Sequence, residues 1–381
     1  MFSGLTWDHP RGYDALAQAE KQVNAGRTDA LLHWSKQPLE GFESAPIAEL
    51  AAEHDLLVLD HPHIGEAVAN DCLHPLEDLY STDQIEAWKA QSIGPSFKSY
   101  RWQNRTWALP LDVATQVMVR RADRVPIAPS NWDEVVDLAA RQPVAQSLAG
   151  PHALLTLFST VAGMGGYVGG ETLLAYDVAE QALAKMHRLY ALRPKGSERL
   201  NPIGLSEAMA RGEIALVPLL FGYVTYAKAG AEQLTFSDTI GAKRPGTGGV
   251  LGGTGIAFCK HSTPTRELLD HIAWLMHPDT QRTLMPAHNG QPSARSAWRD
   301  RAVNDAWGGF YCGCVNTAEN ALLRPRFDGY IAFQIQASAC IRQALEIGED
   351  ETTTAQALRG LWSAARAAAK GPLETDRGYH G

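Results

Sequence analysis

The sequence predicts an α/β protein of two lobes, each a mostly parallel sheet flanked by helices. Its 381 residues are too many for one ordinary core and sufficient for two α/β lobes. The composition, 45% apolar and 20% charged, is that of a globular protein. Segments with strand and helix patterns alternate along the chain, which is typical of parallel sheets covered by helices.

The N-terminal part begins with a strand, a loop and a helix. Residues 2–7 are apolar and β-prone, and residues 8–13 have the composition of a turn-rich loop. Residues 14–24 carry apolar side chains at helical spacing. A second strand is expected at 31–34.

The next unit repeats this order. A short helix is expected at 47–53, followed by a strand at 54–60 whose apolar run indicates burial. A second polar loop, 60–63, follows that strand. In parallel sheets ligands bind outside the carboxyl ends of the strands, so this loop and the loop at 8–13 are both expected at the ligand-binding edge.

The rest of the chain continues the alternation without a repeat of fixed period. The expected elements are a strand through 117–119, a helix over 131–140, a helix over 171–192 after a glycine-rich stretch, a helix over 206–212, a buried strand over 214–220, a glycine-rich loop over 246–255, a strand over 256–259, helices over 265–276 and 280–285, and two C-terminal helices over 331–346 and 352–370. The glycine-rich loop lacks the Lys-Ser/Thr that follows a phosphate-binding P-loop, so a flexible return of the chain is the favoured interpretation.

Charge and cysteine content exclude several classes of partner. The formal net charge of −8 argues against nucleic acid or an anionic membrane surface. The sequence has no run of about 18 apolar residues, the length that a membrane-spanning helix needs, so no such helix is expected. The chain begins without a charged leader, so either a secretion signal was removed or the protein stays in the cytoplasm. Five irregularly spaced cysteines indicate no disulfide framework, and Cys312 and Cys314 are expected to be free or buried thiols.

Several segments, taken in order, resemble the extracellular solute-binding proteins of ABC importers, in particular the sugar-binding, maltose-binding-protein-like family 1. The most specific segment is GTGIAFCKHS at 253–262. The others are AWLM at 273–276, Gln281, NGQPS at 289–293, WALPLD at 107–112 with NWDE at 131–134, EAMARGEIAL at 207–216, and the helical segment 330–361. One departure is Arg120-Arg121, where the family usually has Tyr-Asn.

The resemblance implies a type II periplasmic-binding-protein-like fold with several hinge crossings. These are expected near 110–113, 251–254 and 290–297. Lobe one would comprise 1–111 plus 255–292, and lobe two 114–250 plus 298–381. The implied function is capture of a small polar solute by hinge closure, which removes water from the site. The expected partner is an ABC permease, the expected location is the periplasm or the extracellular face, and the protein is expected to be a monomer.

The candidate ligand contacts lie mainly on the two loops and near the hinge. They are Trp7, His9, Arg11 and Tyr13 on the first loop, His61 and His63 on the second, Asp112 at the first crossing, Phe221 and Tyr223 at a strand end, and Trp307, Tyr311 and Arg326 towards the C-terminus. Aromatic faces and fixed polar groups are typical of such sites. Each has a structural alternative: Trp7 as core with Asp8 as helix cap, Asp112 as a lock on the hinge, and Trp307 and Tyr311 as core.

The ligand class stays open between a sugar and a sugar acid or other hydroxylated carboxylate. Aromatic stacking suits a pyranose, whereas Arg11 can bind a carboxylate in a forked geometry. The two Asp-His-Pro tripeptides, at 8–10 and 60–62, raise a metal site as a lesser alternative, and no cofactor is expected.

The sequence has no Gly-x-Ser-x-Gly elbow, no Gly-x-Gly-x-x-Gly after the first strand and no Cys pair near a βαβ unit, so an enzyme is not expected. Carboxylates are numerous enough to leave a glycosidase pair open. The rival hypothesis is a cytoplasmic enzyme or ligand sensor on the same fold.

Overall fold

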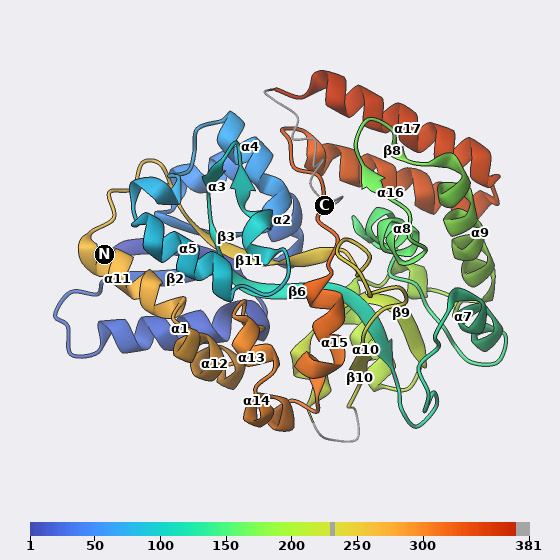
Figure 1. Ribbon diagram of the computed structural model, residues 1–381, viewed down its shortest axis with the longest axis horizontal. Coiled ribbons are helices and arrows are strands. Elements are labelled where there is room, and N and C mark those ends of the chain that lie inside the picture. The colour runs from blue at the N-terminus through green and yellow to red at the C-terminus, as the bar shows by residue number, and fades with distance from the viewer. Residues whose placement is uncertain (229–232, 371–381) are drawn as a thin grey trace.

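One sheet runs through both lobes of the computed structural model, which describes residues 1–228 and 233–370 (Figure 1). Its strand order is β10-β6-β11-β3-β1-β2, with β9 also paired to β6. The strands are β1 (Phe2–Trp7), β2 (Leu32–Gln37), β3 (Leu56–Leu59), β6 (Leu109–Arg120), β9 (Leu216–Phe221), β10 (Thr235–Ser237) and β11 (Leu251–Phe258). Two short hairpins lie outside it, β4 (Arg101–Trp102) with β5 (Arg105–Thr106) and β7 (Val168–Gly169) with β8 (Leu173–Leu174).

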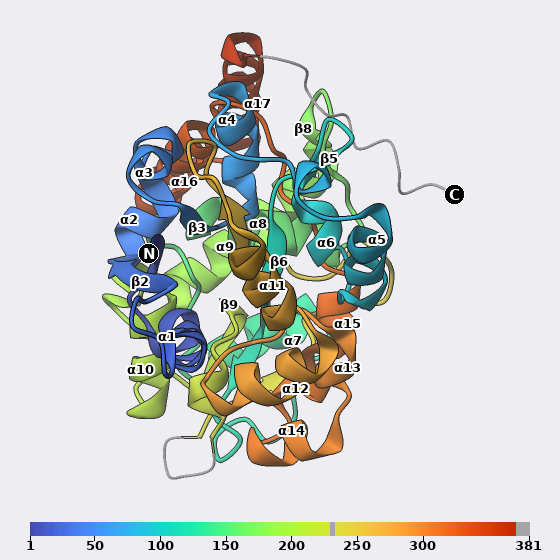
Figure 2. The same cartoon turned by 90° about the vertical axis from the view of Figure 1, so that its left-hand side faces the viewer.

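Lobe one contains the parallel part of the sheet. Strand β1 pairs in parallel with both β2 and β3, as expected from the alternation of strands and helices. Its helices are α1 (Pro10–Asn24), α2 (Leu39–Ser44), α3 (Ile47–Glu53), α4 (Ile64–Ala69), α5 (Thr82–Gln91), α6 (Ser96–Ser99), α11 (Arg266–Leu275) and α12 (Pro278–Ala287), with 3-10 turns η1 (His61–His63) and η2 (Leu76–Asp78). Seen from this end, α1 and α5 lie on opposite sides of the molecule (Figure 2).

Lobe two differs from the expected mostly parallel sheet. Strands β9 and β10 both pair antiparallel with β6, and the parallel contacts among the described residues of this lobe are two isolated bridges, Val144–Leu216 and Val250–Leu322. The reason is that β6 enters this lobe from the hinge, whereas β9 runs back towards it. Strands running in these opposite senses can only pair antiparallel.

Lobe two is mostly helical around these strands. Its helices are α7 (Trp132–Ala139), α8 (His152–Gly163), α9 (Tyr176–Leu192), α10 (Pro202–Ala210), α13 (Arg295–Trp298), α14 (Arg301–Ala306), α15 (Phe310–Glu319), α16 (Tyr330–Ile347) and α17 (Glu351–Ala368), with 3-10 turns η3 (Ser197–Arg199) and η4 (Val224–Ala227). Helix α8 is buried over residues 152–162, because its sequence is apolar on every face. It packs against α9 and α16. Among the described helices, none is long and apolar enough to cross a membrane.

The hinge consists of the two long strands and a third segment. Strands β6 and β11 pass between the lobes in the middle of Figure 1 and pair with each other, with an irregularity between Thr254 and Gly255. A bridge from Asp112 to Pro292 adds the third segment. The glycine-rich stretch is therefore partly strand, since β11 begins at Leu251. Gly253 is required there, because its φ is +100° and a Cβ would lie 2.2 Å from the Asp112 carbonyl oxygen.

The first polar loop is shorter than expected. Helix α1 begins at Pro10, and the His9 side chain caps it by accepting from the backbone N–H of Arg11. The structural alternative considered for this loop had Asp8 as the cap. Proline suits a first helical position because its φ is already helical and it has no N–H to satisfy. Consequently Arg11 and Tyr13 lie in the first turn of α1.

Candidate functional site

The Arg11 side chain joins lobe one to the hinge. Its Nε lies 3.1 and 3.0 Å from the two carboxylate oxygens of Asp112, and its Nη2 also donates to Asp112. Nη1 lies 3.4 Å from the carbonyl oxygen of Gly222 in lobe two. Both charged side chains are buried, with 4% and 3% exposed. A buried charge must be paired and hydrogen-bonded, so Arg11 and Asp112 together form a lock on the hinge.

Asp112 also holds the third crossing. The backbone N–H of Gln291 donates to its Oδ2 at 3.1 Å. The Gln291 side chain in turn donates to the carbonyl of Val113 and accepts from the N–H of Val224. Tyr311 contacts the same crossing, because its hydroxyl donates to the carbonyl of Gly290 at 2.8 Å. These contacts fix all three crossings to one another.

Aromatic rings surround the Arg11 guanidinium. Its centre lies 5.6 Å from the Trp7 ring and 5.0 Å from the Tyr223 ring, within the range of cation–π attraction. His9 stacks on Trp7 at 5.1 Å and meets the edge of Tyr223 at 5.0 Å. Burial and the positive charge of Arg11 lower the pKa of His9 to about 4. The candidate contacts Trp7 and His9 of the first loop therefore do lie together with Tyr223, and they surround the Arg11 guanidinium.

A second polar group follows strand β3. Arg324 donates to Asp60 at 2.5 Å and approaches Gln334 at 3.4 Å. Burial alone would raise the pKa of Asp60, but the neighbouring Arg324 and His61 hold it well below its usual range. Burial and Arg324 lower the pKa of His61 to about 4. Asp60 is therefore ionised and His61 neutral at pH 7.

A small polar cavity lies between the lobes beside this second group. Its volume is about 30 Å³, room for about two water molecules. Its walls come from lobe one and from two parts of lobe two, the region around the start of α8 and the end of β9, and the C-terminal segment. The lining residues are Glu43, Asp60, His63, Pro151, His152, Leu155, Phe221, Arg324, Ile331 and Gln334.

Three of these side chains hold a buried nitrogen that has no hydrogen-bond partner within the described part of the chain. They are His63 at Nδ1, His152 at Nδ1 and Arg324 at Nε. Their residues are 2%, 3% and 4% exposed. An unsatisfied buried polar atom costs about 1–3 kcal/mol, so these three nitrogens make the cavity a candidate site for a polar guest.

The predicted residues divide between the cavity and its surroundings. His63 and Phe221 line the cavity, while Trp7, His9, Arg11, Asp112 and Tyr223 form the hinge lock and its aromatic shell. His61 lies directly behind Asp60, with its Nδ1 3.2 Å from Oδ1. Tyr13 is half-buried on α1, with the Lys36 ammonium 5.0 Å from its ring.

Trp307 and Tyr311, two of the candidate ligand contacts, lie in the core of the protein. Trp307 is 6% exposed and donates to the carbonyl of Pro286, and Tyr311 is fully buried. Arg326 donates to the carbonyls of Lys98 and Ser99, which attaches the C-terminal segment to lobe one. Trp307, Tyr311 and Arg326 therefore stabilise the fold around the site.

Metal and disulfide chemistry find no support in the described part of the chain. No group of three or more His, Cys, Asp or Glu residues is arranged to hold a metal ion there. All five cysteines are free thiols, and Cys312 is the exposed one. The two Asp-His-Pro tripeptides act instead as a helix cap at His9 and as the start of η1.

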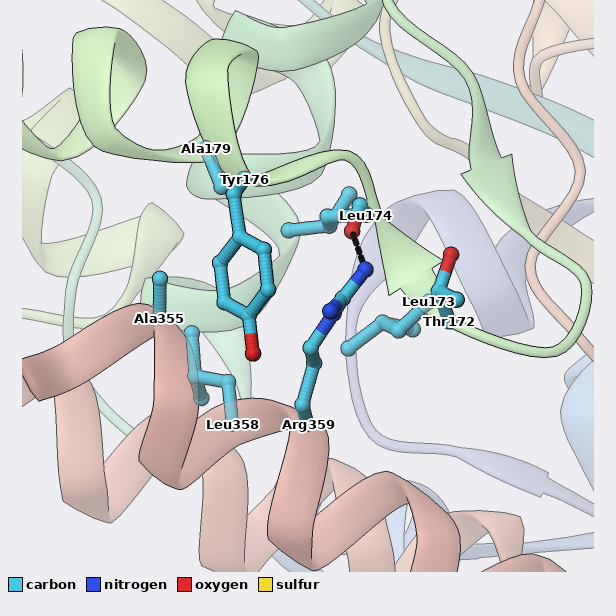
Figure 3. Close-up of a pocket in the computed structure, with 8 residues that line it drawn as sticks. All are labelled: Thr172, Leu173, Leu174, Tyr176, Ala179, Ala355, Leu358 and Arg359. Atoms are coloured by element: carbon cyan, nitrogen blue, oxygen red, sulfur yellow. Dashed lines mark hydrogen bonds between the residues drawn. The ribbon is translucent and has the colours of Figure 1, made fainter. Parts of the chain in front are cut away.

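A second, smaller cavity lies in lobe two, away from the hinge. Figure 3 shows Arg359 of α17 between Tyr176 and the strand β8, donating to the carbonyl of Leu174 at 3.4 Å. The volume of this cavity is about 10 Å³, and its lining is mainly apolar. It has the character of a packing defect between α9 and α17.

The sequence comparison decides the family. Residues 42–308 match the family model of bacterial extracellular solute-binding proteins. The chain belongs to this family. No curated protein matches this solute-binding protein.

Solved structures with low sequence identity share its fold. Maltose-bound MalE3 of T. maritima has a TM-score of 0.79 at 17% identity, covering 94% of this chain and 98% of its own. A ribitol complex of an ABC transporter solute-binding protein from Agrobacterium radiobacter K84 has a TM-score of 0.79 at 16% identity, covering 95% and 98%. The GacH receptor of Streptomyces glaucescens has a TM-score of 0.78 at 13% identity, covering 97% and 99%. The expected type II fold is confirmed.

Glu43 and His152 are among the cavity residues that the sequence analysis missed. Glu43 lies on the short helix α2, which no pattern in the sequence distinguished, and His152 begins the apolar helix α8. A histidine at the start of an otherwise apolar helix, directly after Gly150 and Pro151, is the signal that could have identified the second of them.

Proposed function

We propose that this solute-binding protein is the substrate-binding component of an ABC import system and captures a small polar solute between its lobes by hinge closure. The observation that carries the proposal is the cavity walled by both lobes, with its unsatisfied buried nitrogens. Relatives of the same fold were solved with maltose and with ribitol, which supports a sugar or polyol. Its partners would be the permease subunits of the importer, and its site of action the periplasmic or extracellular side.

The cavity is too small to admit a sugar unless the lobes first move apart and then close around it. Ligand pockets usually measure roughly 300–1,000 Å³, whereas this one measures about 30 Å³. A monosaccharide therefore enters only when the lobes move apart, and the contacts from the three segments form around it afterwards. We place the ligand-contacting residues among His63, Phe221 and their cavity neighbours, with Tyr223 at the margin.

The test is a thermal-shift screen over sugars, polyols, sugar acids and small carboxylates, followed by calorimetry on each hit. A true ligand at about 100 times its Kd adds about 2.7 kcal/mol to stability. We expect one-to-one binding and recovery of the solute unchanged, which also separates a binding protein from an enzyme. Small-angle scattering should show a smaller radius of gyration with the solute. No shift from any polar metabolite, or consumption of the solute, would overturn the proposal.

A further inference from the structure

Each guanidinium group near the cleft already has a partner, although the Nε of Arg324 has none among the described residues. Arg11 is held by Asp112, Arg324 by Asp60, and Arg326 by two backbone carbonyls. A solute carboxylate could bind Arg11 or Arg324 in a forked geometry only by displacing a buried carboxylate, and leaving a buried charge without its partner costs about 3–5 kcal/mol. The forked binding of an acid by Arg11, which the sequence suggested, is therefore not available in this arrangement. The Nε of Arg324 can still donate one hydrogen bond to a solute oxygen.

The cavity itself carries more carboxylates than guanidinium groups. Asp60 and Glu43 line it, against Arg324 alone. Since Arg324 compensates Asp60, Glu43 is the carboxylate whose charge is left over. Its contact is His152, whose Nε2 lies 3.5 Å from Oε1, too long for a good hydrogen bond. Glu43 is 28% exposed, so it borders both the cavity and the solvent.

The histidines of the cavity offer acceptors. Burial lowers the pKa of His63, and its ring hydrogen-bonds the backbone of Phe42. A neutral imidazole that donates through one nitrogen accepts through the other, so the buried Nδ1 of His63 presents a lone pair. The Nε2 of His152 faces Glu43, and its buried Nδ1 has no hydrogen-bond partner in the described part of the chain. A carboxylate and imidazole lone pairs suit a guest rich in N–H and O–H donors.

We infer that the solute is a small hydroxylated amine whose ammonium group binds Glu43, and that solutes bearing a carboxylate are rejected. This inference rests on the proposed function and specifies its ligand. The ammonium would supply the positive charge that Glu43 lacks, and its hydroxyl groups would donate to His63 and His152. An ammonium–carboxylate contact at a partly buried site is stronger than a neutral hydrogen bond.

The test compares sugars that share one ring and carry a positive, neutral or negative substituent. Calorimetry would use D-glucosamine, N-acetyl-D-glucosamine, D-glucose and D-glucuronate, together with the four corresponding galactose derivatives. We expect an amine to bind at least about tenfold more tightly than its N-acetyl form, which has the same ring without the charge, and the acids not to bind. Tenfold corresponds to about 1.4 kcal/mol.

The matched variants are Glu43→Gln and Glu40→Gln. Both lie on α2, and Glu40 is exposed. Glu43→Gln should weaken amine binding about tenfold or more and leave the melting temperature of the free protein unchanged, whereas Glu40→Gln should alter neither. Equal binding of neutral sugars and amines, binding of an acid, or indifference to Glu43→Gln would overturn the ammonium site while leaving solute binding intact. Failure of every member to bind would overturn the ammonium site, whereas solute binding itself would be overturned only if the wider thermal-shift screen also gave no ligand.

Discussion

At the scale of single residues, the buried pair of Arg11 and Asp112 attaches lobe one to the hinge. It combines a buried charge on each side with hydrogen bonds to Gln291 and Gly222. The pair connects residues 101 positions apart in the sequence. Such a contact is a consequence of the fold and has no local signal.

Removing one partner of this pair should be far more costly than removing an exposed one. For Arg11→Met we expect a loss of about 3–5 kcal/mol in the free energy of unfolding, because Asp112 would stay buried and uncompensated. Urea denaturation measures this loss.

The control is Arg27→Met, which breaks the surface pair with Glu267 and should leave the urea midpoint unchanged. The double variant of Arg11→Met with Asp112→Leu should recover part of the lost stability. Equal effects of Arg11→Met and Arg27→Met would show that the buried pair does not hold the hinge.

At the scale of elements, the sequence predicted regular segments well and their ends less well. Strands β1 and β3 and helix α3 begin and end where their apolar patterns do. Helix α1 begins four residues earlier than predicted, because the pattern showed the apolar stripe but not the His9 cap. Strand β11 includes glycines that composition assigned to a loop, since backbone pairing with β6 overrides the low strand propensity of glycine.

The cavity was predictable only in part. Placing polar loops at strand ends identified His63 and the Asp60 loop, because that rule depends on local order along the chain. Glu43 and His152 come from elements that meet only across the cleft. No sequence pattern specifies such a meeting, and the partners of Arg11 and Arg324 were missed for the same reason.

The crossing strand should tolerate no side chain at Gly253. For Gly253→Ala we expect a loss of more than about 2 kcal/mol, because the positive φ costs about 1–2 kcal/mol and the methyl group would collide with the Asp112 carbonyl. Differential scanning calorimetry gives the loss.

Gly26→Ala is the matched control. Its φ is +72°, and nothing lies within 4 Å of its added Cβ, so it should lose the φ contribution alone. If the two variants were equally stable, close contact at the hinge would play no part.

At the scale of the whole molecule, several buried histidines make stability depend on pH. Burial lowers the pKa values of His9, His61 and His271 to about 4, against 6.5 in the unfolded chain. The unfolded state thus binds more protons between these values. The stabilisation is complete above pH 6.5 and is lost as the pH falls towards 4.

Urea midpoints at pH 7, 6 and 5 should therefore decrease, each histidine contributing up to about 1.4 kcal/mol per pH unit. His271→Gln, away from the cavity, should make the decrease shallower, whereas substitution of the exposed His33 should not. A flat profile in the parent protein, or an unchanged slope in His271→Gln, would contradict this account.

The thiol pattern has a practical consequence. Burial raises the pKa values of Cys72, Cys259, Cys314 and Cys340, which slows alkylation because the thiolate is the reacting form. Cys312 is exposed on α15. A maleimide fluorophore should therefore label Cys312 faster than the other four thiols, which gives the unaltered protein one preferred position for a probe.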